Sequence, residues 1–238
     1  AKETVTSEGK LFRTWRNGEA KGSAYLEDYA NVAHGLLELH VATGEVAYLH
    51  ESRRLVEVAI ECFSDKENGG FFFTSHDSEQ LIFRKKEIHD HPFPSGNSMM
   101  ASVLLRLSRI FGDQELTRHA LGSVGIARRL LEQAPSSVAF LLGALEFHLA
   151  APQEIAIVGD MNDERTVELR RVALTRYAPN TVIAFSDGSD CSVPLLAGKG
   201  LINGSPAAYV CQNFSCNTPS LDPDSLKKAL EAEVIQKF

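Results

Sequence analysis

The hydrophobic period of this sequence changes at Pro152, and that change constrains the fold class. From about Leu26 to Ala150, apolar residues recur at spacings of three and four, which is the period of an amphipathic helix. After Pro152 the pattern shifts to short continuous apolar runs such as EIAIVGD (154–160), which are typical of strands buried on both faces. The sequence therefore predicts a mainly α protein, with antiparallel helical hairpins in 1–152 and a small α/β unit in 153–238.

Five helices are expected in the first region, joined by short connections that make neighbours antiparallel. Their expected ranges are 26–43 (ended by Gly44), 45–63, 95–112, 114–134 and 136–150. Between the second and third helices, GGFFFTSHDSEQLIFRKKE (69–87) alternates apolar and polar residues around a polar turn. This pattern predicts an inserted β-hairpin.

The second region alternates strands and helices. After the strand at 154–160 we expect a helix over 164–177 and strands over 181–188 and 207–214. The last helix begins at DPDS, where Asp222 is placed to cap the helix and Pro223 occupies its first turn.

Composition excludes several classes of function. With a net charge of −7 over 238 residues, the chain is a poor partner for nucleic acid or an anionic membrane. No apolar run approaches the roughly 18–20 residues of a membrane span. The N-terminal residues have no apolar core of a signal peptide, and four cysteines are too few for a disulfide framework, so we expect a cytoplasmic protein.

The cysteines and glycines suggest no cofactor. Cys211 and Cys216 could form a disulfide or half of a metal site, but Cys62 and Cys191 stand alone and complete no zinc site. Free thiols are the favoured interpretation, and no metal is predicted. The IVGD segment lacks both a Gly-x-Gly-x-x-Gly pattern and a Walker lysine, so a nucleotide site is rejected.

Residues 85–98, KEIHDHPFPSGNS with its flanking lysine, allow two interpretations. In the simpler one, Ser95 caps the third helix and the apolar residues that follow pack in the core. In the other, Glu87, His89, Asp90 and the adjacent His91 gather at the rim of a pocket. Helix N–H groups beside Ser95 and Asn97 would then bind an anion or a sugar hydroxyl.

A second cluster of polar residues lies in the first expected helix, from its first turn onward. Glu27, Asn31, His34 and Glu38 follow one stripe of this helix, and a solvated outer face is the preferred interpretation for Glu38. Asp28 and Tyr29 are candidates for a pocket. Acidic residues in a first turn also favour the helix dipole, and the two roles are compatible.

Two kinds of chemistry fit these residues. Asp28 with Glu87 or Asp90 could supply the carboxylate pair of glycoside hydrolysis. Alternatively, two histidines drawn from His34, His89 and His91 could move a proton next to a carbonyl, as sugar epimerisation requires. The candidate residues are Asp28, Glu87, His89 and Asp90 for catalysis, and Tyr29, His34, Ser95 and Asn97 for substrate binding.

Five blocks carry a resemblance to a known family. They are AKGSAYLEDYANVAHGLLELHVATG, GGFFFT, RKKEIHDHPFPSGNS, EIAIVGD and AAYVCQNFSCNTP. Together they resemble the C-terminal part of the YyaL-type family, the spermatogenesis-associated thioredoxin-domain proteins. The family motifs cover Asp28, Tyr29, Glu87, Asp90 and the PSGNS run, but Asp90-His91-Pro92 stands where Asp-Gly-Ala is expected.

The resemblance implies a fold and two functions. It implies an (α/α)6-barrel similar to six-hairpin glycosidases and sugar 2-epimerases, preceded by a thioredoxin-like domain whose Cys-x-x-Cys this chain lacks. We therefore expect a fragment or truncated relative that acts on or binds a sugar or polyol. The alternative is a non-catalytic scaffolding domain serving an upstream thioredoxin-like module. Five helices cannot close a barrel of twelve, so we expect self-association or contact with the remaining hairpins.

Overall fold

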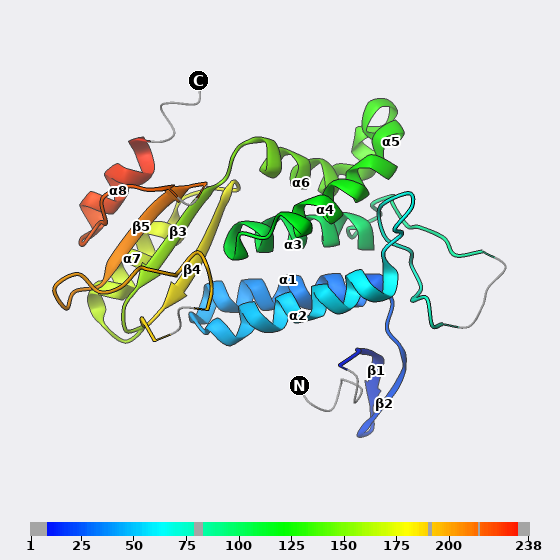
Figure 1. Ribbon diagram of the computed structural model, residues 1–238, viewed down its shortest axis with the longest axis horizontal. Coiled ribbons are helices and arrows are strands. Elements are labelled where there is room, and N and C mark those ends of the chain that lie inside the picture. Colours follow the sequence, from blue (N-terminus) through cyan, green and yellow to red (C-terminus); the bar gives the residue numbers. More distant parts are fainter. Residues whose placement is uncertain (1–8, 79–82, 190–191, 214, 233–238) are drawn as a thin grey trace. The chain divides into compact units, whose positions relative to one another are not determined.

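The computed structural model describes residues 9–78, 83–189, 192–213 and 215–232 (Figure 1). The chain divides into two compact units. The helical unit contains Ala1–Leu37, Leu49–Ser108 and Asp113–Glu146, and the sheet unit contains Glu38–Tyr48, Arg109–Gly112 and Phe147–Phe238. The sheet unit thus includes the ends of several helices as well as the α/β tail.

Antiparallel helical hairpins build the helical unit, as the sequence predicts. Helix α1 (Leu26–Thr43) pairs with α2 (Val46–Phe63), and α3 (Gly96–Phe111) pairs with α4 (Gln114–Ile126) (Figure 1). A short helix α5 (Arg128–Gln133), a 3₁₀ turn (Pro135–Val138) and α6 (Ala139–Leu149) follow.

Helix α3 is the centre of this core. Its side chains Met100, Leu104 and Leu107 are fully buried, and each buried leucine contributes about 2 kcal/mol by leaving water. The predicted cap is confirmed, because the Ser95 hydroxyl accepts a hydrogen bond from the Ser98 N–H at 3.2 Å. Gly44, with φ +81°, follows the end of α1 as predicted.

Two sequence predictions are wrong in detail. The helix expected over 114–134 divides at Ala127, whose N–H turns back to the carbonyls of Val124 and Gly125. The strands expected within 69–87 are not formed in the described part of that segment, and residues 79–82 lie outside it. There Phe71 forms an isolated bridge with Ser64, and the Phe73 N–H donates to the Lys85 carbonyl at 2.8 Å.

A hairpin forms instead near the start of the chain. Strand β1 (Phe12–Arg16) pairs antiparallel with β2 (Glu19–Ser23). Asn17 and Gly18 connect them with φ of 53° and 79°, the positive values that a tight two-residue hairpin turn requires.

The sheet unit confirms the predicted order of strands and helices. Strands β3 (Gln153–Val158), β4 (Thr181–Ser186), β5 (Ala207–Gln212) and β6 (Ser215–Cys216) are arranged β4-β3-β5-β6. Strands β3 and β4 are parallel and are joined through α7 (Glu164–Thr175), whereas β5 runs antiparallel to β3. Helix α8 (Pro223–Ala232) begins after Asp222, whose carboxylate accepts from the Ser225 N–H at 2.9 Å.

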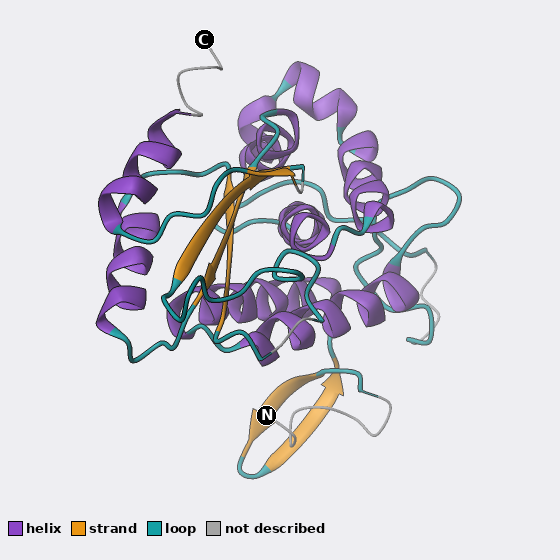
Figure 2. Ribbon diagram, turned by 60° about the vertical axis from the view of Figure 1, so that its left-hand side comes forward, coloured by secondary structure: helices purple, strands orange, loops and turns teal. Residues whose placement is uncertain are grey.

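One face of the sheet holds the apolar core of this unit. Figure 2 shows α7 and α8 together on one side of the strands. The buried residues of this core are Ile155, Ile157, Leu169, Ala173, Phe185, Ala208, Val210, Leu226 and Leu230.

The cysteines of the last strands differ from expectation. Cys211 and Cys216 form a disulfide, so the prediction of free thiols is wrong at both positions. The reason is strand register: these residues are direct partners across the β5–β6 pair. Within the described ranges, no helix is long and apolar enough to cross a membrane.

Candidate functional site

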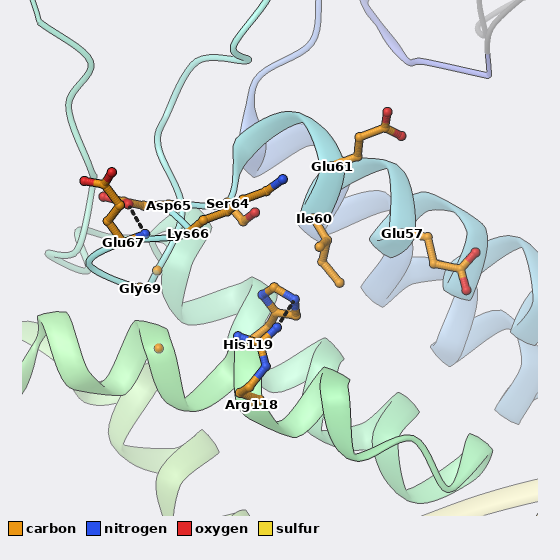
Figure 3. A pocket seen from close by; sticks show the side chains of 12 residues that line it. Glu57, Ile60, Glu61, Ser64, Asp65, Lys66, Glu67, Gly69, Arg118 and His119 are labelled. Carbon is orange, nitrogen blue, oxygen red and sulfur yellow. Dashed lines mark hydrogen bonds between the residues drawn. The ribbon is translucent and has the colours of Figure 1, made fainter.

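A half-open cavity of about 650 Å³ lies in the helical unit between α2, α4 and the loop 64–70. We name it the α2–α4 cavity. Figure 3 shows Ile60 extending from α2 and His119 from α4 toward the same space, with the loop residues to one side. The lining consists of Glu57, Ile60, Glu61, Ser64, Asp65, Lys66, Glu67, Gly69, Gly70, Arg118, His119 and Gly122.

Asp65 organises the loop that borders this cavity. Its carboxylate accepts hydrogen bonds from the backbone N–H groups of Glu67 and Asn68 at 2.9 and 3.0 Å. It also forms an ion pair with Lys86 at 2.8 Å. The Lys86 contact, together with the N–H donors, holds the pKa of the Asp65 carboxyl well below its ordinary value. Asp65 is therefore a charged anchor of the loop at neutral pH.

Glycines let the loop approach α4 closely. Gly69 and Gly70 have φ of +75° and +67°, values that favour glycine. A Cβ atom on Gly69 would lie 3.2 Å from the Gly122 Cα, and one on Gly122 would lie 3.0 Å from the Gly70 nitrogen. Side chains at these positions would push the loop away from α4 and open the cavity wall.

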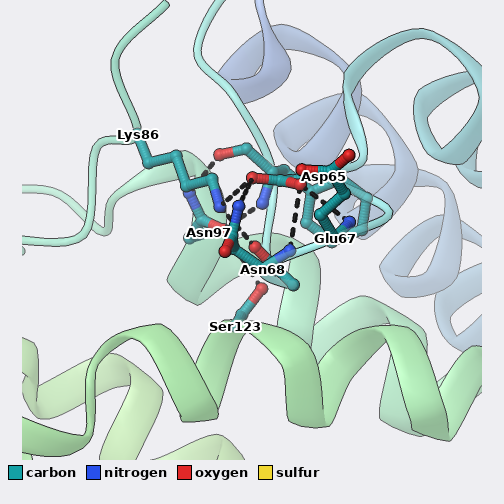
Figure 4. Close-up of polar contacts among 8 residues, drawn as sticks. Asp65, Glu67, Asn68, Lys86, Asn97 and Ser123 are labelled. Carbon is teal, nitrogen blue, oxygen red and sulfur yellow. Dashed lines mark hydrogen bonds and ion pairs between the residues drawn. The ribbon is translucent and has the colours of Figure 1, made fainter.

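Asn97 lies behind this wall (Figure 4). Its Nδ2 group donates to the carbonyls of Phe71 and Glu87 at 2.9 and 2.8 Å. Its Oδ1 atom accepts from the Phe71 N–H at 2.9 Å and from the Ser123 hydroxyl at 3.1 Å. The amide is fully buried and occupied by the protein itself, so it holds the residues next to Gly70 in place.

His119 is the titratable ring of the cavity. Burial lowers its pKa, and the nearby Arg118 acts in the same direction. An Arg118 N–H group lies 3.2 Å from His119 Nε2, and the same guanidinium donates to Glu115 at 2.7 Å. A neutral imidazole is thus favoured, and because Nε2 accepts from Arg118, the N–H on Nδ1 is the group that can donate to a ligand.

The predicted catalytic acids are engaged in helix capping. Asp28 accepts from the Tyr25 N–H at 2.8 Å and from Arg13 at 2.7 Å. Asp90 uses one oxygen for the Ser95 N–H and the other for the Phe140 N–H, both at 2.9 Å. These contacts hold the starts of three helices, α1, α3 and α6.

The remaining predicted residues are more dispersed. Glu87 pairs with Lys85 at 2.8 Å, and His89 is exposed. His34 is half-buried on α1. Ser95 is buried, and its hydroxyl group donates a hydrogen bond to the Ser98 hydroxyl. Their proposed roles in catalysis or substrate binding stay predictions.

Tyr29 borders a second cavity, of about 200 Å³, between the β1–β2 hairpin and the first two helices. Its ring is buried and contacts Phe63 edge-on at 5.3 Å, and its hydroxyl accepts from the Leu11 N–H at 2.9 Å. Burial raises the pKa of this hydroxyl. The described contacts of Tyr29 are therefore those of a core residue.

The structure brings together two segments that contain candidate residues, the start of α1 and the start of α3. A Cβ on Gly96 would lie 3.2 Å from the Glu27 nitrogen, so the start of α3 lies directly against the start of α1. However, neither Asp28 nor Asn97 is among the residues that line the two cavities. The two helix starts adjoin, but these side chains serve other contacts.

The cavity-lining residues were missed by sequence analysis. One signal was available, because the run SDKENGG places an aspartate before Asn-Gly-Gly, which is a strong sign of a side-chain-stabilised turn. Glu57 and His119 gave no such signal. They lie on different helices, and only packing brings them to one cavity.

Comparisons with known proteins place the chain among relatives. No family model matches it. It is 31% identical over 212 residues to human spermatogenesis-associated protein 20, covering 87% of this chain and 27% of that protein. The rat protein of the same name is 29% identical over 212 residues, with the same coverage. An uncharacterised protein of Caenorhabditis elegans is 27% identical over 205 residues, 85% of this chain and 28% of that protein. The chain spans about a quarter of the length of the curated relatives it matches.

Proposed function

Because this chain belongs to the spermatogenesis-associated protein 20 family, we propose that it is a ligand-binding part of a larger (α/α)-barrel. The proposed ligand is a small hydroxyl-rich molecule, a sugar or polyol, and its site is the α2–α4 cavity.

The mixed polar lining of this cavity is the observation that carries the proposal. Glu57, Glu61 and Glu67 offer acceptors, while Lys66 and Arg118 offer donors. Hydroxyl groups both donate and accept, so a polyol can satisfy both kinds of partner. The volume of about 650 Å³ lies within the range usual for small-molecule sites. Carboxylates outnumber cations in the lining, which disfavours a phosphorylated ligand.

We propose binding without assigning a reaction. Asp28 and Asp90, the carboxylates expected for acid–base chemistry, cap helices with their oxygens. A catalytic acid must reach the substrate with a free proton or lone pair, and capping competes with that use.

Thermal unfolding in the presence of ligands tests the proposal. A panel of neutral sugars, polyols and sugar phosphates should contain a neutral compound that raises the melting temperature, because a ligand of the native state stabilises it. His119→Ala with Glu61→Gln should abolish this shift. Glu132→Gln, an exposed change on α5 outside the lining, should leave it intact. The proposal fails if no neutral compound gives a shift, or if the cavity variants respond like the Glu132→Gln control.

A second candidate function is a non-catalytic protein-interaction domain. It is favoured by α6, where Leu142 and Leu149 are 42% and 72% exposed. A binding partner recovered equally by the cavity variants would support this function over ligand binding.

A further inference from the structure

Three residues of the sheet unit form a row across neighbouring strands. Glu154 on β3 is the register partner of Cys211 on β5, and Cys211 is the partner of Cys216 on β6. Directly opposed side chains point to the same face of a sheet, with Cβ atoms about 4.5–5.5 Å apart. Ile155 and Val210, the next pair along, lie on the other face, in the core formed with α7 and α8. The disulfide and the acid therefore share the face opposite that core.

Burial decreases along this row. Glu154 and Cys211 are fully buried, whereas Cys216 is exposed. A thiolate from solvent can thus reach the Cys216 sulfur, but the Cys211 sulfur is shielded. Thiol–disulfide exchange depends on such access, because the incoming thiolate must approach one sulfur while the other leaves.

Charged groups gather at the buried end of the row. Arg109 donates to the Asn213 side chain, in the connection between the two cysteines, at 2.9 Å and lies 3.8 Å from a Glu154 oxygen. Lys199 interacts electrostatically with Glu154, and burial lowers the pKa of its ammonium group. Glu154 is the register partner of Cys211, so its carboxyl group lies on the same face of the sheet as that sulfur.

A purely structural role explains this disulfide poorly. The cysteines are five positions apart, and closing so short a loop removes less entropy from the unfolded chain than closing a long one does. Neither cysteine belongs to the core cluster of the sheet unit. The bond also holds a strand of two residues, β6, at the edge of the sheet.

We propose that Cys211 and Cys216 form a redox-active disulfide that oxidises a dithiol substrate, with Glu154 as the proton donor to Cys211. This inference is independent of the proposed ligand site, which lies in the helical unit.

Reduction of the Cys211–Cys216 bond is coupled to oxidation of the dithiol. A thiolate of the dithiol attacks the Cys216 sulfur, the Cys211–Cys216 bond breaks, and Cys211 leaves as a thiolate that takes a proton from Glu154. The second thiol of the dithiol loses its proton to Glu154 through solvent and attacks the mixed disulfide, releasing Cys216 as a thiolate. The two cysteines are reduced by two electrons, and the dithiol is oxidised to its disulfide.

Reduction of the folded chain by dithiothreitol is the first test. Cys62→Ser and Cys191→Ser form the background, so that maleimide labelling followed by mass measurement reports the pair alone. We expect dithiothreitol to reduce the bond without denaturant, so that labelling after an acid quench and unfolding finds both cysteines modified, while reduction changes the melting temperature little. A bond that is reduced only after the chain unfolds would overturn the proposal.

Single variants identify which sulfur is attacked. With oxidised glutathione, Cys211→Ser should acquire one glutathione on Cys216, and Cys216→Ser should stay unmodified at the buried Cys211. Equal modification of the two variants would contradict the proposed order of attack.

A third comparison tests Glu154. Glu154→Gln should slow reduction by dithiothreitol about 100-fold, the lower end of the range for proton transfer by a positioned group. Glu154→Asp should recover part of the rate, because it restores the carboxyl group, and Glu146→Gln on the exposed side of α6 should have no effect. An unchanged rate in a folded Glu154→Gln variant removes Glu154 from the reaction. If that variant does not fold, the two single cysteine variants still decide the proposal.

Discussion

Asn97 satisfies four polar groups with one side chain. These groups are the N–H and the carbonyl of Phe71, the carbonyl of Glu87 and the hydroxyl of Ser123. All lie in a buried region, where a polar group without a partner is costly. The Asn97 amide thus supplies hydrogen bonds that a second strand would otherwise provide, and it holds the segment expected to form a β-hairpin as a loop.

We predict that Asn97→Ala lowers the free energy of unfolding by about 3 kcal/mol or more, since removal of one partner leaves each buried group with a penalty of about 1–3 kcal/mol. Urea denaturation followed by circular dichroism measures this change. Asn31→Ala is the matched control, because Asn31 is exposed on α1 and its loss should change stability by less than about 0.5 kcal/mol. Similar losses in the two variants would refute the assigned role.

The sequence pattern marked Ser95 and Asn97 as candidate residues, but it did not indicate all of the contacts that they make. The cap at Ser95 follows from local rules, since its partner is three residues away. Asn97 bonds Phe71 and Ser123, each 26 residues away in opposite directions. When the partners of a polar residue near a helix start are so distant in the sequence, no local pattern reveals them. Such a residue is then easily taken for part of a ligand site.

At the scale of elements, Asp90 connects two helices. One carboxylate oxygen receives the Ser95 N–H before α3, and the other receives the Phe140 N–H in the first turn of α6. The Asp90 N–H also donates to the Ser137 carbonyl at 2.8 Å. One residue in a loop therefore fixes two helix starts that are far apart in the sequence.

We predict that Asp90→Ala lowers stability by about 3 kcal/mol, from two hydrogen bonds to a charged acceptor worth about 1.5–3 kcal/mol each. Asp90→Asn keeps one acceptor oxygen and should lose about half as much. Thermal and urea unfolding measure both changes, with the exposed neighbour His91→Ala as control. If Asp90→Asn were as stable as the parent chain, the capping role would be wrong.

The end of α1 carries a buried histidine next to β4. His40 is fully buried, its Nε2 atom accepts from the Phe185 N–H at 3.1 Å, and its Nδ1 atom lies 2.9 Å from the Glu45 carbonyl. Burial is the main cause that lowers the pKa of His40 below 6.5, and Arg170 acts in the same direction. The folded chain therefore holds this imidazole neutral where the unfolded chain would protonate it.

This difference predicts a loss of stability in acid. As the pH falls below about 6.5, His40 binds a proton in the unfolded state but stays neutral in the folded state. The free energy of unfolding should therefore fall by up to about 1.4 kcal/mol per pH unit. His40→Gln should flatten the slope measured by urea unfolding between pH 7 and 5. A residual slope is expected, because the pKa values of His119 and His148 are also lowered. His89→Gln, an exposed change, should leave the slope as it is, and an unaltered slope in His40→Gln would contradict the assignment.

Elements with local signals were predicted better than elements held by distant contacts. Asp222 and Gly44 marked helix ends correctly, because caps and positive φ values depend on a few neighbouring residues. The β1–β2 hairpin was missed although Asn17-Gly18 is a known turn signal. The apolar run at Phe71 was taken for a strand because alternation alone does not show whether a ladder partner exists.

At the scale of the whole molecule, α6 bears on the question of further hairpins. Its outward positions include Ala139, Leu142, Gly143 and Leu149, with Glu146 among them. This stripe is apolar and rich in small residues, as a helix surface is when it packs against another helix. The chain covers 27% of the human relative.

We therefore expect the isolated chain to self-associate through α6, with a second copy covering this stripe. Sedimentation velocity over a concentration series should give a mass that rises above that of the monomer. Leu142→Lys with Leu149→Lys should keep the chain monomeric, because a lysine ammonium group at a buried contact carries a large desolvation cost. Val167→Lys, which changes an apolar residue 45% exposed on α7, should associate like the parent. A parent chain that remains monomeric at every concentration would mean that the apolar stripe of α6 is stable in water without a partner.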